Sequence, residues 1–352
     1  MKKRVSNRLV WLSIAVMLTW TVASAAGAQV MKPLADGFPK RAITIINIDD
    51  PGTRDGIYAR MFQQACKGLS PVPIIVSDEP IATGGTWMKV HELRKRPGAL
   101  EGYYPFVNTL FGVATDLQVE PRTKEIGAKM EDLKNIINTE LMAHFMIMRK
   151  DAPWGKTFDG FVKYAKEHPG ELKYVSYEVG SGQDIDMEVI MAKVGGLKVK
   201  KIPQGTMQEC ASAVGAGEAD FSMLGADVAV TNYQAGRVLV ALVVADKVPP
   251  PFDKDPNVSS AKAFGLPTFI GTFLGLAVNS EVPQSHIDWM YTMFKAASEK
   301  PEFSKRWQGM LPGDTPRPMT GAEADKTMRE IYAACDQIIR DIGLHIDQQK
   351  PK

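Results

Sequence analysis

The sequence predicts an α/β protein of two domains, each built on a mixed β-sheet flanked by helices. Three observations support this prediction. Apolar, β-branched runs typical of buried strands alternate with segments of helical periodicity. Turns rich in glycine and hydroxyl residues separate the runs, and repeated strand–helix units form parallel or mixed sheets. The chain of 352 residues is also longer than one domain of ordinary size.

The first group of strand–helix units follows directly after the N-terminal segment. Residues 42–48 are a β-branched run that predicts a buried strand, and residues 54–67 carry apolar side chains at helical spacing. Between them, the turn at 49–53 contains proline and glycine. The remaining elements predicted for this part are strands at 74–76 and 103–107 and a helix at 87–94.

The second group begins with a strand-like segment at 144–149, followed by a helix that Thr157 caps and that runs to Glu167. Further strands are predicted at 172–176, 199–202, 219–223, 238–244 and 273–278, and further helices at 184–193, 206–214, 283–300, 301–308 and 321–342. The strands near 144–149 and 273–278 are expected to join the two domains. We therefore expect domain I at 29–145 plus 275–352, and domain II at 146–274.

The first 28 residues have the pattern of a cleaved secretory signal peptide. Four of the first eight residues are basic, an apolar run covers 9–23, and two small-residue exits, Ala-Ser-Ala and Ala-Gly-Ala, follow. These exits predict a mature chain that begins at Ala26 or Gln29 in the periplasm. The alternative is a membrane anchor, but the apolar run is shorter than the about 20 residues that a spanning helix needs.

The overall charge argues against a nucleic-acid partner. The formal net charge is only +2, from 42 basic and 40 acidic residues. Beyond the N-terminus the densest basic run is 94–96, which is short and typical of a solvated helix end.

The three cysteines, Cys66, Cys210 and Cys335, are widely spaced, and none precedes Cys66, which excludes a lipoprotein anchor at the cleavage site. The sequence contains no Cys-x-x-Cys motif and no Cys–His spacing of the kind that forms a structural zinc site. Two alternatives remain open: two of the cysteines form a disulfide, or all three are separate buried thiols.

A search for catalytic motifs gives no enzyme class. The five histidines form no His-Glu-x-x-His pattern, and Ser181 is not in the Gly-x-Ser-x-Gly elbow of a hydrolase. Residues 215–219 resemble the start of a dinucleotide fingerprint but precede a strand instead of following one. We therefore predict a binding protein without catalytic activity, cofactor or metal.

Three turns that follow predicted strands are the candidate ligand-binding loops. Ligands of α/β proteins bind beyond the carboxyl ends of strands, where helix N-termini offer free N–H groups that suit a carboxylate. Glycine at these points lets the backbone approach the ligand. The candidate residues are Pro51, Gly52, Thr53, Arg54 and Asp55, then Thr83, Gly84, Gly85 and Thr86, and finally Gly180, Ser181 and Gln183.

These segments together resemble the periplasmic solute receptors of tripartite tricarboxylate transporters, the Bug family. Residues 38–46 are similar to the family's YPxRPITIIV opening, 51–55 to the end of its PFxPGGTTD loop, and 80–85 to RPGAGG. Residues 176–188 align with SxGxGSxxHLAGE, and 215–220 resemble the end of its LLGGxVD segment. The resemblance implies a Venus-flytrap fold, a small carboxylate ligand, membrane permease subunits as partners, and a monomer.

The departures from the family pattern fall on the expected cleft loops. Asp184 stands where the family usually has histidine, Gln204 replaces tyrosine, and Phe273 replaces a common tryptophan. The resemblance places all three at the ligand. Asp49 and Asp50 replace apolar or small residues, and these acids would exclude highly charged anions such as citrate, favour a ligand with an amine, or face solvent.

Two further interpretations of the function remain open from the sequence. The same fold and ligand would suit a periplasmic sensor that acts on a signalling partner, and a secreted enzyme would use the same cleft. At residue level, Arg54 adds a charge and a forked donor to the first loop, so it is expected to contact a carboxylate. The alternative has Asp55 as helix N-cap and Arg54 paired with Asp49 or Asp50 at the surface.

Overall fold

The computed structural model describes residues 30–81, 85–140, 144–177, 180–266, 273–310 and 316–349. The predicted signal peptide and both predicted cleavage sites lie outside these residues. The described chain forms two six-stranded mixed sheets flanked by helices, which confirms the predicted fold class.

The first sheet has the strand order β12-β4-β11-β3-β1-β2, with β1, β2 and β3 parallel and the other pairs antiparallel. Its strands are β1 (Ile43–Asn47), β2 (Ile74–Asp78), β3 (Phe106–Thr109), β4 (Leu133–Glu140), β11 (Phe273–Asn279) and β12 (Arg317–Thr320). Its helices are α1 (Arg54–Ala65), α2 (Gly85–Leu93), α3 (Leu110–Val119), α4 (Pro121–Glu125), α9 (Gln284–Ser298), α10 (Pro301–Met310) and α11 (Gly321–Asp341). We call this sheet with its helices the first lobe.

The second sheet has the order β10-β9-β5-β8-β6-β7, in which β5 runs antiparallel to both of its neighbours. Its strands are β5 (Phe145–Met148), β6 (Lys173–Tyr177), β7 (Lys200–Gln204), β8 (Phe221–Leu224), β9 (Leu239–Val243) and β10 (Ser259–Ser260). Its helices are α5 (Phe158–Glu167), α6 (Gly182–Lys193), α7 (Met207–Gly215) and α8 (Ala226–Gln234). We call this set the second lobe.

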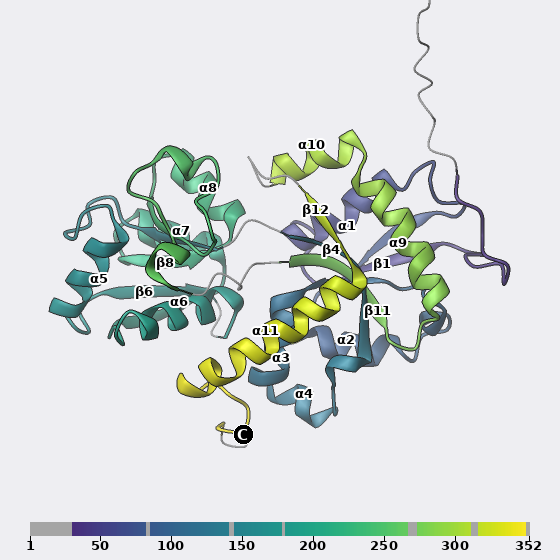
Figure 1. Cartoon of the computed structure of the whole chain (residues 1–352), viewed down its shortest axis with the longest axis horizontal. Helices are drawn as coiled ribbons and strands as arrows, with labels where there is room; N and C mark the ends of the chain where they lie inside the picture. The colour runs from purple at the N-terminus through teal and green to yellow at the C-terminus, as the bar shows by residue number, and fades with distance from the viewer. Residues whose placement is uncertain are drawn as a thin grey trace, which may run out of the picture.

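The chain changes sheet twice, between Glu140 and Phe145 and between Phe264 and Phe273. Figure 1 shows the result as two lobes, the second in teal and green on the left and the first on the right. The segments 144–149 and 273–278, expected to join the domains, each lie mainly in a strand of a single sheet. The domain boundaries at 145/146 and 274/275 remain a prediction.

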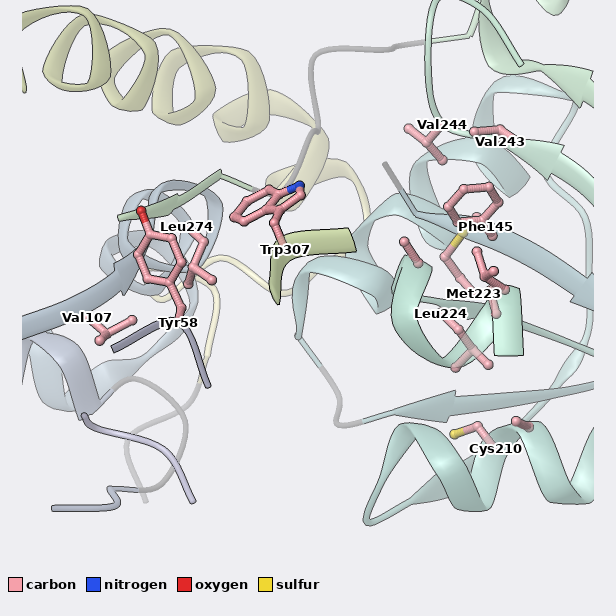
Figure 2. Packing of buried hydrophobic residues seen from close by; sticks show 14 of the residues in the cluster. Tyr58, Val107, Phe145, Cys210, Met223, Leu224, Val243, Val244, Leu274 and Trp307 are labelled. Atoms are coloured by element: carbon pink, nitrogen blue, oxygen red, sulfur yellow. The ribbon is translucent and has the colours of Figure 1, made fainter. Parts of the chain in front are cut away.

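Buried apolar side chains pack against both sheets. Figure 2 shows Tyr58, Leu274 and Trp307 in one group, and Phe145 and Met223 in another. All five side chains are fully buried. The central strands are apolar on both faces because helices cover both faces of a mixed α/β sheet; in β5, for example, every residue is buried. Both groups belong to one connected cluster of buried residues, which therefore extends over both lobes.

The lobes also touch through helices. Gly182 of α6 lies so close to Phe111 of α3 that a β-carbon at this glycine would be 2.9 Å from Phe111 Cδ1. Ile185 and Val189 of α6 are buried in the same apolar cluster as Phe111 and as Cys335 of α11. The N-terminal part of helix α6 therefore packs against the first lobe.

The elements absent from the sequence-based expectations include helix α3 and strand β4. Helix α3 follows β3 with no loop between them, so no turn residue marks its start. Strand β4 contains three asparagine or threonine residues, which interrupt the apolar pattern. In both segments, tertiary packing outweighs the weak local preference of the sequence for a helix or a strand.

The three cysteines are all buried, and no disulfide joins them. Burial raises the pKa of the Cys66 thiol to about 12, which makes it a poor nucleophile. Within the described part of the chain, no helix combines the length and apolarity required to cross a bilayer.

Candidate ligand-binding site

A cavity of about 240 Å³ lies between the two lobes. The first lobe contributes Ile48, Asp49, Arg54, Asp55, Ile81, Gly85, Thr86, Thr109, Gly112, Thr115 and Asp116, and the second contributes Tyr177, Gly180, Ser181, Gly182, Gln183 and Met207. A larger cavity of about 600 Å³ lies between α4 and α11, but its lining comes from the first lobe and its C-terminal extension alone. We treat the two-sided cavity as the candidate site because both lobes contribute to its lining.

The first turns of four helices converge on this cavity. Arg54 and Asp55 begin α1, Gly85 and Thr86 begin α2, and Thr109 is the N-cap of α3. From the second lobe, Ser181 caps α6 and accepts a hydrogen bond from the Asp184 backbone N–H at 3.3 Å. The first N–H groups of a helix have no partner within the helix and carry partial positive charge, so this cavity offers an environment for a carboxylate.

The loop before α1 is held in place by its own side chains. Asn47 Nδ2 donates to the carbonyl of Asp49 at 2.6 Å and to Asp78 Oδ1 at 2.9 Å. Thr53 Oγ1 donates to the Asp50 carbonyl at 2.7 Å. Gly56 packs under this loop, where a β-carbon would lie 2.6 Å from the Pro51 carbonyl oxygen. The loop is therefore a fixed platform at the edge of the cavity.

Arg54 and Asp55 form the charged part of the α1 start. Their side chains are 16% and 12% exposed, and Arg54 Nε lies 3.4 Å from Asp55 Oδ1. Burial raises the pKa of Asp55, partly opposed by the neighbouring guanidinium. The N-cap of α1 is Thr53, so the alternative that Asp55 caps the helix is wrong. Arg54 lines the cavity and reaches toward Gly225 of the second lobe.

Asp184 lies beneath the third loop, outside the cavity lining. Its side chain is fully buried and accepts from Ser176 Oγ at 2.7 Å and from the Gly180 N–H at 2.9 Å. Lys201 Nζ lies 2.6 Å from the same carboxylate. This carboxylate fixes the conformation of the turn that carries Gly180 and Ser181 against the cavity.

The predicted site residues divide into three groups. The cavity brings together Arg54, Asp55, Gly85, Thr86, Gly180, Ser181 and Gln183. Its described lining does not include Pro51, Gly52, Thr53, Asp184, Gln204 or Phe273. Thr83 and Gly84 lie outside the described residues.

The sequence analysis missed the contribution of α3. Thr109, Gly112, Thr115 and Asp116 all line the cavity from one face of this helix. The signal that would have found them is a hydroxyl residue, Thr109, directly after the strand and at N-cap position. Met207 also lines the cavity, and Gln183 Nε2 lies 3.5 Å from its sulfur.

Two lobes of mixed α/β sheets with a cavity between them define a two-domain solute-binding protein. The particular family follows from the sequence itself. Residues 59–344 match the model of the tripartite tricarboxylate transporter family receptor, TctC, and the chain belongs to this family. Its members are periplasmic solute-binding receptors rather than enzymes, which confirms the resemblance found in the sequence.

Similar proteins agree with this assignment. A UPF0065 protein of Bordetella pertussis is 25% identical over 245 residues, which cover 68% of this chain and 72% of the relative. A TctC solute-binding protein from Polaromonas, solved without ligand, has a TM-score of 0.70 and 21% identity, covering 86% of this chain and 99% of its own. Rpa4515 of R. palustris, solved with adipate, has a TM-score of 0.70 and 15% identity, covering 87% and 98%.

Proposed function

We propose that this chain captures a small organic carboxylate in the cavity between its lobes and delivers it to the membrane permease of a tripartite tricarboxylate-type transporter. The observation that carries the proposal is the convergence of four helix N-termini, from both lobes, on one cavity. Their free N–H groups and dipoles favour a carboxylate. A volume of about 240 Å³ lies below the roughly 300–1,000 Å³ of drug-sized pockets, which supports a small ligand.

Membership in the receptor family supports delivery to a transporter, and the adipate in the related Rpa4515 supports a carboxylate ligand. The pattern of the first 28 residues supports export through a cleaved signal peptide. N-terminal sequencing of the exported protein should find Ala26 or Gln29 at the start. An intact Met1 in the membrane fraction would contradict export as a soluble receptor.

The binding proposal is tested by thermal unfolding of the mature protein against a panel of mono- and dicarboxylates. A true ligand at about 100 times its dissociation constant should add about 2.7 kcal/mol of apparent stability. Thr86→Val, in the cavity lining, should reduce this gain, whereas Arg329→Ala, in the larger cavity between α4 and α11, should not. The proposal fails if no acid in the panel stabilises the protein, or if only Arg329→Ala removes the effect.

A further inference from the structure

A second cavity, of about 600 Å³, lies in the first lobe between α4 and α11. Its lining comes from two segments of the chain, 117–131 and 329–347, and among the described residues none lines both this cavity and the one between the lobes. The volume falls within the about 300–1,000 Å³ that is typical of sites for small molecules. The first lobe therefore offers a separate place for a ligand of its own.

The C-terminal extension after α11 forms a fixed wall of this cavity. The Ile346 N–H donates to the Gln118 carbonyl, at the end of α3, over 2.7 Å. Gln349 Nε2 donates to the neighbouring Val119 carbonyl at 3.0 Å. His345, which also lines the cavity, is only 4% exposed. Figure 1 shows this yellow segment turning back below the end of α11. Hydrogen bonds therefore hold the chain that encloses the cavity in position.

Three polar groups of the lining are available to a ligand. Arg329 and Tyr332 are three residues apart on α11, so their side chains lie on the same face of the helix, and Lys129 comes from the other segment. Within the described part of the chain, no acid pairs with Lys129 or Arg329, and the Tyr332 hydroxyl has no hydrogen-bond partner. Burial raises the pKa of Tyr332, so its hydroxyl keeps the proton. All three groups are donors, which suits an anion.

Cations outnumber acids in this lining. The cations are Lys124, Lys129, Arg329 and Arg340, and the acids are Glu131 and Asp347. Asp347 lies 3.3 Å from Lys124 Nζ and 3.5 Å from Arg340 Nη2. Arg340 Nε also lies 2.9 Å from Asp336, outside the described lining. These pairs leave Lys129 and Arg329 without an acid, and in the described lining only the exposed carboxylate of Glu131 opposes them.

Apolar side chains complete the lining. They are Leu117, Ala128, Met130 and Ile346, from the end of α3, the segment before β4 and the C-terminal extension. Apolar surface combined with a few polar groups is typical of sites that bind small molecules. The lining therefore suits an anion attached to an apolar body better than an inorganic ion.

We infer that this cavity is a second binding site, which takes a small organic phosphate monoester with Lys129, Arg329 and Tyr332 donating to the phosphate oxygens. A phosphate monoester carries about 1.5 to 2 negative charges at pH 7 and presents three acceptor oxygens, which match two free cations and a hydroxyl. A single carboxylate has one charge and two oxygens. The planar fork of Arg329 binds two phosphate oxygens at once, and Lys129 adds a point charge. This site does not depend on the proposed function, because the two described linings share no residue.

The test uses phenyl phosphate and benzoate, which have the same apolar ring and differ in the anion. In calorimetric titration of the mature protein, Arg329→Ala should weaken phenyl phosphate by about tenfold, the effect of one charged hydrogen bond, and should leave benzoate unchanged. Lys326→Ala is the matched control, because Lys326 is a 75% exposed cation of α11 that does not line the cavity. Thr86→Val, in the other cavity, should also leave phenyl phosphate unchanged. The inference fails if phenyl phosphate does not bind, if Arg329→Ala binds it like wild type, or if benzoate loses as much.

A further variant should give a gain of affinity, which damage to the fold would not produce. Glu131→Gln removes the unpaired acid of the lining and should tighten phenyl phosphate by about twofold to fivefold. A lower affinity would overturn the inference.

Vesicles identify the source of the phosphate group, since phosphatidic acid also carries a phosphate monoester. Binding to vesicles of phosphatidic acid in phosphatidylcholine that Arg329→Ala abolishes would support the inference with a lipid headgroup as the ligand. Binding of phenyl phosphate without binding to these vesicles would support it with a soluble ester.

Discussion

Arg54 is the residue on which we expect recognition of a carboxylate to depend most directly. It is the only cation in the described cavity lining, its side chain is 16% exposed, and it begins α1 on a loop braced by Asn47 and Thr53. The alternative interpretation paired Arg54 with Asp49 or Asp50 at the surface, whereas in the structure Arg54 contacts Asp55 at 3.4 Å. An arginine that is already desolvated and held in place loses little entropy when it binds an anion.

We therefore expect Arg54→Ala to weaken binding of a carboxylate that stabilises the protein against thermal unfolding. The expected loss of affinity is about tenfold to a hundredfold, which corresponds to the free energy of one charged hydrogen bond. Arg54→Lys should lose less, because it keeps the charge but not the forked donor. Calorimetric titration measures both. A change of less than about threefold for Arg54→Ala would mean that the loop backbones carry recognition instead.

A second residue-scale feature is the buried pair of His144 and Asp186 beside the first chain crossing. His144 Nδ1 lies 2.6 Å from Asp186 Oδ2, and both residues are almost completely buried. Burial raises the pKa of Asp186 to about 6, although the hydrogen bond with His144 acts in the opposite direction. Burial, and in addition the charge of Asp186, raise the pKa of the Cys335 thiol in α11 to about 12.

This pair predicts a loss of stability between about pH 4 and pH 6. An unfolded aspartate has a pKa of about 3.9, so in this window the unfolded chain has released a proton that the native protein still holds. Raising the pH therefore favours the unfolded state, by up to about 3 kcal/mol. Above pH 6 the native carboxyl also ionises and the contribution stays constant.

The comparison is urea unfolding of wild type and Asp186→Asn at pH 4, 5, 6 and 7. Asparagine keeps the shape of the side chain and an acceptor for His144 but cannot ionise. The unfolding free energy of wild type should fall relative to that of Asp186→Asn across the window. A constant difference at all four pH values would show that Asp186 titrates normally.

At the scale of elements, the stability of helix α11 depends on the cap at its N-terminus. It is 21 residues long and packs along α3, the helix that presents Asp116 to the cavity. Thr320 Oγ1 accepts from the Glu323 N–H at 3.2 Å, and the Glu323 carboxylate accepts from the Thr320 N–H at 2.8 Å. This reciprocal cap satisfies two N–H groups that would otherwise lack partners.

Replacing Thr320 with alanine should lower the free energy of unfolding by about 1 kcal/mol, because one capping acceptor is lost. Thr320→Ser retains the hydroxyl and is the matched control, with an unfolding free energy close to that of wild type. Urea denaturation followed by circular dichroism measures the difference. Equal stability of the alanine and serine variants would show that the cap does not stabilise α11.

The local sequence pattern was enough to predict many of the helices and strands. Thr157 and Thr206 both cap the helices expected after them, accepting from the Gly160 and Glu209 N–H groups. Helix α3 was missed because β3 runs into it without a turn. Its apolar residues cover most of its surface, since it is packed between α11 and α6. Such a helix has no amphipathic stripe to detect.

For the whole molecule, two lobes joined by two chain crossings make hinge closure the natural response to a ligand that touches both lobes. We expect small-angle scattering to show compaction at saturating ligand. An acid that fails to stabilise the protein is the matched control and should leave the scattering curve unchanged. An unchanged radius of gyration with a saturating, tight ligand would contradict closure.

The sequence by itself determined the alternation of strands and helices, the two mixed sheets, the receptor family and three turns that each lead residues into the cavity. These follow from local periodicity, from glycine and hydroxyl residues at strand ends, and from motifs carried by short segments. Only the tertiary structure decided which side chains reach the cavity. Asp184 lies beneath its loop because Ser176 and Lys201 hold it there, whereas Asp116 enters the site from α3, a helix that the sequence analysis missed. Arg54 of the first lobe approaches Gly225 of the second lobe, far away in the sequence. The physical reason is that burial and charge balance are properties of groups brought together from distant parts of the chain, which no local pattern contains.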